Sequence, residues 1–478
     1  MRKFEKRFIL LLLAVLLAAA LTACGDKGEP ELDIELPPEP ADGVLIYAAL
    51  NPATNELNSA VSSFNSSHTD VQIEVRDYSD ENGTQRLLLE LMAGRVPDIM
   101  ELHQLGENGD ISAFLPNEDP PEDEYWMPYQ RLVETGYLED LWPYIDADPE
   151  LGRDLLLETP LKAAEVNGGL YMLFNEVSIT TLVGAERVVG DRCGWTFEEL
   201  MDAFSDMPPD ATILRYSATQ KEIFSRLFSI SLGRYVDWEK GQCTFDSQEF
   251  RSMVEFLKTF PTEFETTLSA EALEDELFYR LWEGNQMLEA RSIVNQTTIT
   301  KLDAFFNERV SFPGYPTADA SSGSYFRLKG RVMAMSSTCR YKDAAWEFMR
   351  QHLRSRYNNS GKMEDALRQS DIAIPINRKD YELGSRVAVS YLNPDDPNVL
   401  PLYTCPNGPI LGADAPDADD IQRFDELVSN TTQIYWPDDT LTDIVWDAIG
   451  PCLAGNKTLD ETVALIQNRV QLYVNEQK

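Results

Sequence analysis

The residues that could do chemistry in this chain are scattered polar and aromatic side chains rather than members of a catalytic motif. No GxSxG, HExxH, P-loop or GxGxxG sequence occurs. The chain holds 80 Asp and Glu residues, so a pair of acids suited to glycoside hydrolysis can be chosen in many ways and identifies no site. The chemistry that the sequence favours is reversible hydrogen bonding, without a cofactor.

The candidate binding residues stand just past segments expected to be strands. Ligands of parallel α/β sheets bind beyond the carboxyl ends of the strands. This rule selects Asn51, Tyr78, Asp80, Glu101, His103, Asn175, Ser178 and Arg291. Such side chains pair donors and acceptors as sugar hydroxyls require, and an aromatic ring can cover the C–H face of a sugar. The aromatic candidates are Trp126, Trp238, Tyr325 and Trp436. Each of these residues has a structural alternative in core packing, turns or ion pairs.

The elements that would position these residues begin with a β-α-β-α-β order. Residues 44–50 form a short apolar run typical of a buried parallel strand, and residues 71–75 alternate as a second strand. Residues 98–102 give a third strand, and helical spacing recurs between the strands. This order predicts a mainly parallel sheet flanked by helices.

Later segments add capped helices and short strands. The pairs Thr196–Glu199 and Thr458–Glu461 have capping-box spacing. The spacing of apolar residues predicts helices over 200–204, 221–232 and 342–353, a helix capped by Asp246, a last helix with Val463, Ile466, Val470 and Val474 on one face, and strands over 212–216 and 332–335. Residues 393–420, rich in Pro, Asp and Gly, are expected to be irregular.

The N-terminus is typical of an export signal. Four basic residues precede the 14-residue apolar run Phe8–Leu21, which is too short for an ordinary membrane span. Leu21-Thr22-Ala23-Cys24 resembles a bacterial lipobox, so residues 1–23 are interpreted as a lipoprotein signal peptide and Cys24 as the lipid attachment site. The alternative is an ordinary signal peptide cut near Ala23. Residues 24–43, acidic and Pro-rich, predict a disordered tether.

Charge and cysteine usage exclude several classes of function. The net charge of −39 repels phosphates, so no nucleic-acid partner is expected. Three histidines argue against a His-built metal centre, and no metal site is predicted. The remaining cysteines, at 193, 243, 339, 405 and 452, lack CxxC spacing. Disulfides between Cys193 and Cys243, or between Cys405 and Cys452, stay open.

Four stretches together resemble the family 1 extracellular solute-binding proteins of ABC importers, the family of maltose-binding proteins. They are the segment from Val61-Ser-Ser-Phe-Asn65 to Val75, Met92-Ala-Gly-Arg-Val-Pro-Asp-Ile99, Gly168-Gly-Leu-Tyr171 followed by Gly194-Trp-Thr-Phe-Glu-Glu-Leu200, and Ala334-Met-Ser-Ser337 followed by Ala345-Trp-Glu-Phe348. Phe174 and Asn175 stand where relatives often carry Pro.

The resemblance implies a two-lobed periplasmic-binding-protein fold of class II type, with lobe 1 at 44–173 plus 324–378 and lobe 2 at 178–316 plus 379–478. It implies a non-enzymatic receptor on the extracellular face of the bacterial membrane that captures a small polar ligand, an oligosaccharide in the first place, and delivers it to an ABC permease. It also favours Trp436 as a ligand contact. A glycosidase-like enzyme, an adhesive lipoprotein and a receptor for a non-sugar solute remain alternatives.

Overall fold

The computed structural model describes residues 39–51, 54–80, 82–104, 125–214, 219–238, 240–263, 268–354, 373–382, 403–404, 410–411 and 416–477. The signal segment, Cys24, Cys405 and most of the stretch 393–420 lie outside the described residues. No helix in the described ranges has both the length and the apolar composition of a membrane span.

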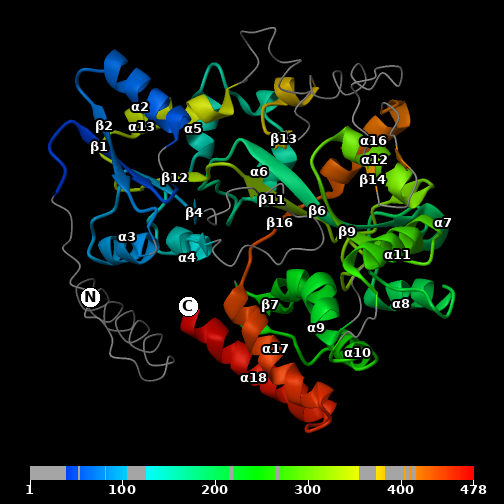
Figure 1. Cartoon of the computed structure of the whole chain (residues 1–478). Helices are drawn as coiled ribbons and strands as arrows, with labels where there is room; N and C mark the ends of the chain where they lie inside the picture. The colour runs from blue at the N-terminus through cyan, green and yellow to red at the C-terminus, as the bar shows by residue number, and fades with distance from the viewer. Residues whose placement is uncertain are drawn as a thin grey trace.

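The first sheet has the strand order β12-β3-β1-β2. Its centre, β1 (Val44–Ala49), pairs in parallel with β2 (Gln72–Asp77) and β3 (Ile99–Glu101), and β12 (Met333–Met335) closes one edge in the antiparallel sense. Helices α2 (Asn55–Ser67) and α3 (Gly83–Met92) connect the parallel strands, seen in blue in Figure 1. The predicted β-α-β-α-β order is therefore confirmed.

The second sheet is built around one long strand, β6 (Glu176–Ala185). Its antiparallel partners are β9 (Leu288–Ile293), β10 (Val310–Ser311), β11 (Tyr325–Lys329) and β13 (Ile374–Pro375). Among the described strands of this sheet, only β16 (Gln433–Ile434) adds a parallel pair, with β11. The expectation of a mainly parallel sheet in both halves is wrong for this one, because an apolar run has the same pattern in either strand direction and does not determine its partner's direction.

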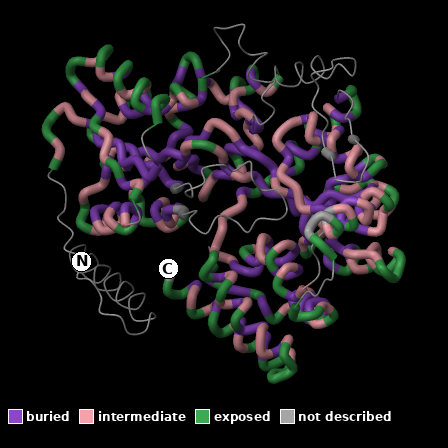
Figure 2. Tube along the Cα trace, viewed as in Figure 1, coloured by how far each residue is buried: buried purple, intermediate pink, exposed green. Residues whose placement is uncertain are grey.

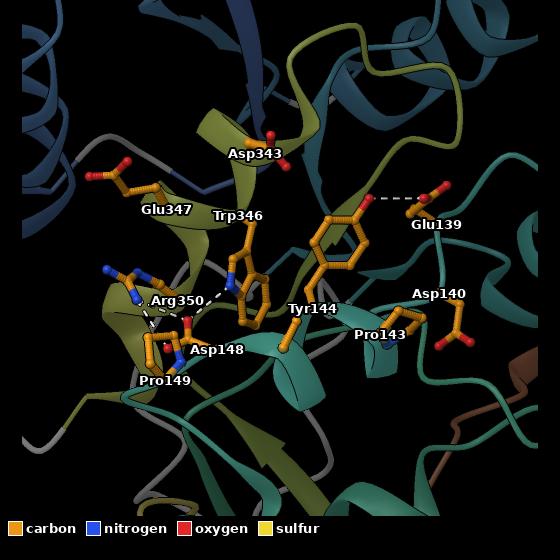
Figure 3. Close-up of a pocket in the computed structure, with 11 residues that line it drawn as sticks. Glu139, Asp140, Pro143, Tyr144, Asp148, Pro149, Asp343, Trp346, Glu347 and Arg350 are labelled. Carbon is orange, nitrogen blue, oxygen red and sulfur yellow. Dashed lines mark hydrogen bonds and ion pairs between the residues drawn. The ribbon is translucent and has the colours of Figure 1, made fainter.

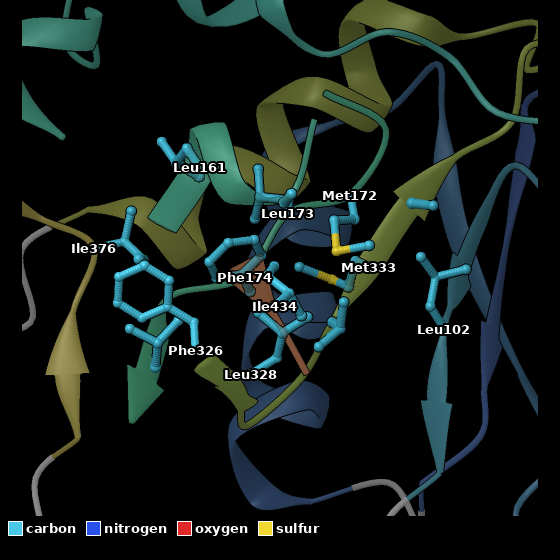
Figure 4. Packing of buried hydrophobic residues seen from close by; sticks show 14 of the residues in the cluster. Leu102, Leu161, Met172, Leu173, Phe174, Phe326, Leu328, Met333, Ile376 and Ile434 are labelled. Carbon is cyan, nitrogen blue, oxygen red and sulfur yellow. The ribbon is translucent and has the colours of Figure 1, made fainter. Parts of the chain in front are cut away.

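Two neighbouring segments join the sheets. Only Gly330–Val332 separate β11 of the second sheet from β12 of the first. Beside them, Leu173 donates its N–H to the carbonyl of Met333 at 2.7 Å and accepts the N–H of Met333 at 2.9 Å. Figure 4 shows Leu173, Phe174 and Met333 packed together at this crossing. The chain thus passes between the two sheets along a pair of hydrogen-bonded segments.

Two large apolar clusters form the core of the described residues, besides a small one around Phe278. The first extends from the helices around the first sheet to one face of β6, where Val177, Ile179 and Val183 alternate. The second lies on the opposite face of β6, beginning at Leu182. The side-chain period of two along a strand explains why one strand serves both clusters. Figure 2 shows the buried residues concentrated along both sheets.

Further helices pack around the sheets or against one another. In chain order they begin with α4 (Tyr129–Glu134), α5 (Trp142–Ala147), η2 (Arg153–Leu155), α6 (Glu158–Ala163) and α7 (Glu186–Val189). They continue with α8 (Phe197–Ser205), α9 (Gln220–Ile223), η3 (Phe224–Phe228), η4 (Ser229–Tyr235), α10 (Gln248–Leu257), α11 (Ala270–Trp282) and α12 (Gln296–Phe306). The last are α13 (Lys342–Met349), η5 (Arg350–Leu353), α16 (Ala418–Asn430), α17 (Asp439–Leu453) and α18 (Leu459–Gln477). Three two-stranded ribbons pair β4 (His103–Gln104) with β5 (Tyr125–Trp126), β7 (Val236–Asp237) with β8 (Gln242–Cys243), and β14 (Tyr403–Thr404) with β15 (Ile410–Leu411).

Two of the three predicted helix starts agree with the structure. Thr196 and Glu199 form the capping box of α8, and the side chain of Glu461 accepts the N–H of Thr458 at 2.9 Å. The four valine and isoleucine positions of α18 are at most 1% exposed. Ser247, rather than Asp246, caps α10.

Other predicted elements differ in extent or type. The predicted helix over 221–232 is split into α9, a π-turn (η3) and a 3₁₀ segment (η4). The predicted strand at 212–216 is only an isolated bridge between Thr212 and Gln286 over its described part. The segment 342–353, predicted as one helix, is α-helical over α13 and then continues as the 3₁₀ turn η5.

Candidate ligand-binding site

A polar pocket with an aromatic wall lies where β16 passes the helices α4 and α6. Its volume is about 250 Å³. Its walls are formed by Tyr129, Gln130, Ala163, Ala164, Glu165, Val166, Thr432, Gln433, Ile434 and Trp436. The pocket therefore joins helices beside the first sheet to a strand of the second.

The aromatic wall is a stacked pair. The rings of Tyr129 and Trp436 are 5.3 Å apart at their centroids and inclined by 20°. The hydroxyl of Tyr129 donates to the carbonyl of Ala164 at 3.1 Å, and burial raises the pKa of Tyr129, so that the donor keeps its proton. Trp436 is half-buried, so part of its indole stays open to the pocket. Such a ring can cover an apolar ligand face.

Local structure fixes both rings. Tyr129 is the first residue of α4, directly after Pro128. Trp436 follows Tyr435, whose N–H donates to the carbonyl of Phe326 in β11 at 2.8 Å. The pairing register between β11 and β16 therefore determines where the indole of Trp436 lies.

Polar groups surround the aromatic wall. Gln130, Thr432 and Gln433 are exposed and offer amides and a hydroxyl. Glu165 accepts the indole N–H of Trp142 at 2.8 Å through one carboxylate oxygen. Planar amides and a carboxylate beside an aromatic ring can hydrogen-bond a polyhydroxylated ligand and cover its C–H face.

Asn51, Glu101 and His103 come together at the carboxyl ends of β1 and β3, as predicted, but in a closed cluster. Glu101 is fully buried and accepts the hydroxyl of Tyr47 at 2.8 Å, the side-chain amide of Asn51 at 2.8 Å and two backbone N–H groups at 2.9 Å. Arg331 adds an ion pair to the same carboxylate. The amide of Asn51 also donates to the carbonyl of His103 at 2.8 Å.

This carboxylate holds the strand ends and the crossing segment together. Burial and the nearby charge of Glu101 raise the pKa of Tyr47 well above its usual range, so its hydroxyl stays a donor. Arg331 lies between β11 and β12, and its pairing with Glu101 fixes the crossing segment to the end of β3. In this conformation the cluster is structural.

The other predicted contacts lie apart from the pocket. The hydroxyl of Tyr78 donates to Glu90 at 2.8 Å, and Asp80 pairs with Arg86. Trp238 packs edge-on against Tyr473, 5.9 Å between centroids. Chain order does not show which face of a strand or helix a side chain occupies. These candidates can therefore follow a predicted strand and still point away from the pocket.

The candidates on the second sheet also lie away from the pocket walls. Arg291 pairs with the buried Glu289 at 3.3 Å and covers the ring of Phe305 at 5.6 Å. Ser178 is fully buried in β6, and the backbone carbonyl of Asn175 accepts the N–H of Ile376 at 2.8 Å. Tyr325, also on this sheet, lies next to Tyr315, with 6.1 Å between the ring centroids.

Trp126 belongs to neither sheet and lies opposite His103 in the β4–β5 ribbon. Among the candidates whose side chains the structure describes, Trp436 is the one that lies in the pocket walls.

Tyr129, Gln130, Glu165 and Gln433 were not predicted. The only signal in the sequence is Pro128, which marks a helix start immediately before Tyr129. Glu165 and Gln433 carry no signal, because their meeting depends on how β16 crosses α6.

One acidic group among the described residues has the spacing of a cation site, at the start of α16: Asp417, Asp419 and Asp420. Asp417 caps the helix by accepting two backbone N–H groups, Asp419 pairs with Arg309, and Asp420 pairs with Arg423. These carboxylates are therefore already engaged in capping α16 and in ion pairs.

The four described cysteines, 193, 243, 339 and 452, are free thiols, so the Cys193–Cys243 disulfide does not form here.

Structural comparison defines the class of fold. No family model matches the sequence, and no curated protein matches it. A periplasmic oligogalacturonide binding protein from Yersinia enterocolitica superposes with a TM-score of 0.50 at 14% identity, covering 91% of this chain and 100% of that chain. A de novo designed cysteine esterase gives 0.50 at 14% identity, with 91% and 98% coverage. The sugar-binding protein MalE from Xanthomonas citri gives 0.48 at 11%, with 90% and 97% coverage.

The chain therefore has the fold of the two-lobed periplasmic binding proteins. This confirms the two-lobed α/β fold that the sequence resemblance implied.

Proposed function

We propose that this chain is the solute-binding component of an ABC importer and that it captures a carbohydrate, an oligosaccharide in the first place. The observation that carries the proposal is the pocket in which Trp436 stacks on Tyr129 among exposed amides. An aromatic ring suits the C–H face of a sugar and the amides suit its hydroxyls. The likeness in fold to an oligogalacturonide binding protein supports the same ligand class.

The lobes are proposed to comprise residues 44–173 plus 324–378 and residues 178–316 plus 379–478. The segments that cross between the sheets, around Leu173 and Met333, are where a closing motion would bend. A ligand in the pocket would touch α4 on one side and β16 on the other. Closure would then be driven by contacts that exist only when both sides reach the ligand.

The proposal places the protein on the extracellular face of the membrane, attached through a lipid on Cys24. The support is the apolar run ending in Leu21-Thr22-Ala23-Cys24. A lipid chain contributes roughly 0.8 kcal/mol per buried CH₂. Export of the full chain and a Cys24→Ser variant, followed by separation of membrane and medium, tests this: the variant should move to the medium.

The ligand class is tested by a thermal-shift screen over neutral oligosaccharides, oligogalacturonides, polyols and peptides. A specific carbohydrate should raise the melting temperature as its concentration passes the Kd. Stabilisation by a non-sugar solute alone would replace carbohydrate as the ligand class. Solution scattering with the stabilising sugar should show a smaller radius of gyration.

A glycosidase-like enzyme is a further alternative within this fold. Incubation with the stabilising oligosaccharide and analysis of the products separates the two. A receptor leaves the oligosaccharide intact over many hours, whereas an enzyme shortens it.

A further inference from the structure

A second and larger pocket lies between α5 and α13, and it shares no residue with the candidate carbohydrate site. Its volume is about 660 Å³. The walls are formed by Glu139, Asp140, Pro143, Tyr144, Ala147, Asp148, Pro149, Asp343, Trp346, Glu347 and Arg350. Figure 3 shows the rings of Tyr144 and Trp346 in its middle, with carboxylates around them.

The two rings are held by their polar ends. The hydroxyl of Tyr144 donates to Glu139 at 3.0 Å, and the indole N–H of Trp346 donates to Asp148 at 3.0 Å. Their centroids are 5.8 Å apart and the rings are tilted by 40°. Because each donor is already used, the rings offer the pocket mainly their faces and edges. The negative face of an aromatic ring attracts cations.

The charge around these rings is strongly negative. Five carboxylates contribute to the walls, from Glu139, Asp140, Asp148, Asp343 and Glu347, against one guanidinium. That guanidinium, on Arg350, is held by the buried Asp148 at 2.9 Å. Lys342 pairs with Glu139 at 2.7 Å, and His68 reaches Glu347 at 3.3 Å. Even with these partners, acids outnumber bases around the pocket.

Asp343 and Glu347 are the carboxylates best placed to meet a ligand. Both are exposed, and they occupy successive turns of α13 on either side of Trp346. Asp140 accepts the backbone N–H groups of Trp142 and Leu170 at 3.0 Å each, whereas the contact of Glu347 with Nε2 of His68, at 3.3 Å, involves one carboxylate oxygen. Burial and the charges of Glu139 and Asp343 raise the pKa of Tyr144, in keeping with a negative field at its ring.

We propose that this pocket binds a small organic cation bearing primary ammonium or guanidinium groups. The ring face of Tyr144 would contact the cation, and its ammonium or guanidinium groups would reach Asp343 and Glu347 on either side of Trp346. Such a group combines cation–π attraction with charge-assisted hydrogen bonds to carboxylates. An anion is disfavoured because the one guanidinium is already paired with Asp148.

The test uses spermidine as the probe and the mature full chain, by calorimetric titration at low salt and at 0.15 M salt. A neutral diol of similar length measures purely apolar binding. The variant Asp343→Asn/Glu347→Gln should bind spermidine about tenfold more weakly or worse. The matched control, Glu198→Gln/Asp202→Asn on α8, removes the same charge from an exposed surface away from the pocket.

The expected result is saturable binding of spermidine by the native chain and the control, a loss in the α13 variant, and no binding of the diol. Equal weakening in both double variants would reduce the effect to the overall charge and overturn the proposal. Binding of the diol as tightly as spermidine would also overturn the proposal. A Trp436→Ala variant that still binds spermidine excludes the carbohydrate pocket as its location, whereas loss of spermidine binding there would overturn the proposal.

Discussion

The indole of Trp436, just after β16, stacks on the phenol ring of Tyr129 at the start of α4, with 5.3 Å between ring centroids. This contact ties a strand of the second sheet to a helix beside the first. Both rings also form walls of the proposed carbohydrate pocket. The pair therefore links ligand contact to the relative position of the two halves.

Replacing Trp436 with alanine is expected to weaken carbohydrate binding about tenfold or more, because a ring face is lost from the pocket. The variant should keep its fold, since Trp436 is half-buried. Trp238→Ala is the matched control, because that indole packs on Tyr473 away from the pocket. Titration of the stabilising sugar measures both. Unchanged affinity in the Trp436 variant would remove this residue from the site.

Tyr129→Phe should separate the ring from its hydroxyl. The stack on Trp436 is retained, so affinity for the sugar should stay within about twofold. The carbonyl of Ala164 loses its donor, which should lower the free energy of unfolding by about 1 kcal/mol. Urea denaturation measures the free energy of unfolding, and titration measures the affinity for the sugar. A large loss of affinity would show that the hydroxyl itself contacts the ligand.

Glu101→Gln should destabilise the chain by about 3 kcal/mol, because the buried Arg331 pair is broken and the four other donors face a neutral amide. The midpoint of urea unfolding measures the loss. Glu56→Gln, on the exposed side of α2, is the control and should change stability by less than about 0.5 kcal/mol. Equal effects of the two changes would contradict the structural role given to Glu101.

The buried pair of Asp148 and Arg350 should contribute a pH-dependent part of the stability. Burial by itself would raise the pKa of Asp148, but hydrogen bonds from the N–H of Glu150, from Arg350 and from Trp346 outweigh it and lower the pKa below 3.8. Stability from this group is therefore present above about pH 4 and is lost as the pH falls through the lowered pKa.

Arg350→Ala should cost about 3 kcal/mol near pH 7 and progressively less below pH 4. Arg187→Ala is the control, because Arg187 is exposed and its pair with Glu308 should be worth under about 1 kcal/mol. Thermal unfolding between pH 3 and pH 7 compares them. A loss in Arg350→Ala that does not shrink at low pH would separate the effect from the charge of Asp148.

The sequence alone determined the features that depend on neighbours along the chain. The β-α-β-α-β order, the Thr196–Glu199 capping box and the buried stripe of α18 follow from short-range periodicity and side-chain to backbone hydrogen bonds. The resemblance of spaced motifs gave the two-lobed fold, which the structure confirms.

Only the tertiary structure decided which polar side chains meet. Asn51 and Glu101 were expected at one sheet edge, yet Arg331, distant in sequence, closes the cluster. Trp436 reaches Tyr129 only because β16 pairs in parallel with β11. Strand direction in the second sheet and the partners of each charge are set by contacts between segments far apart in the chain. Local patterns carry no information about such contacts, because their free energy arises only when the whole core is packed.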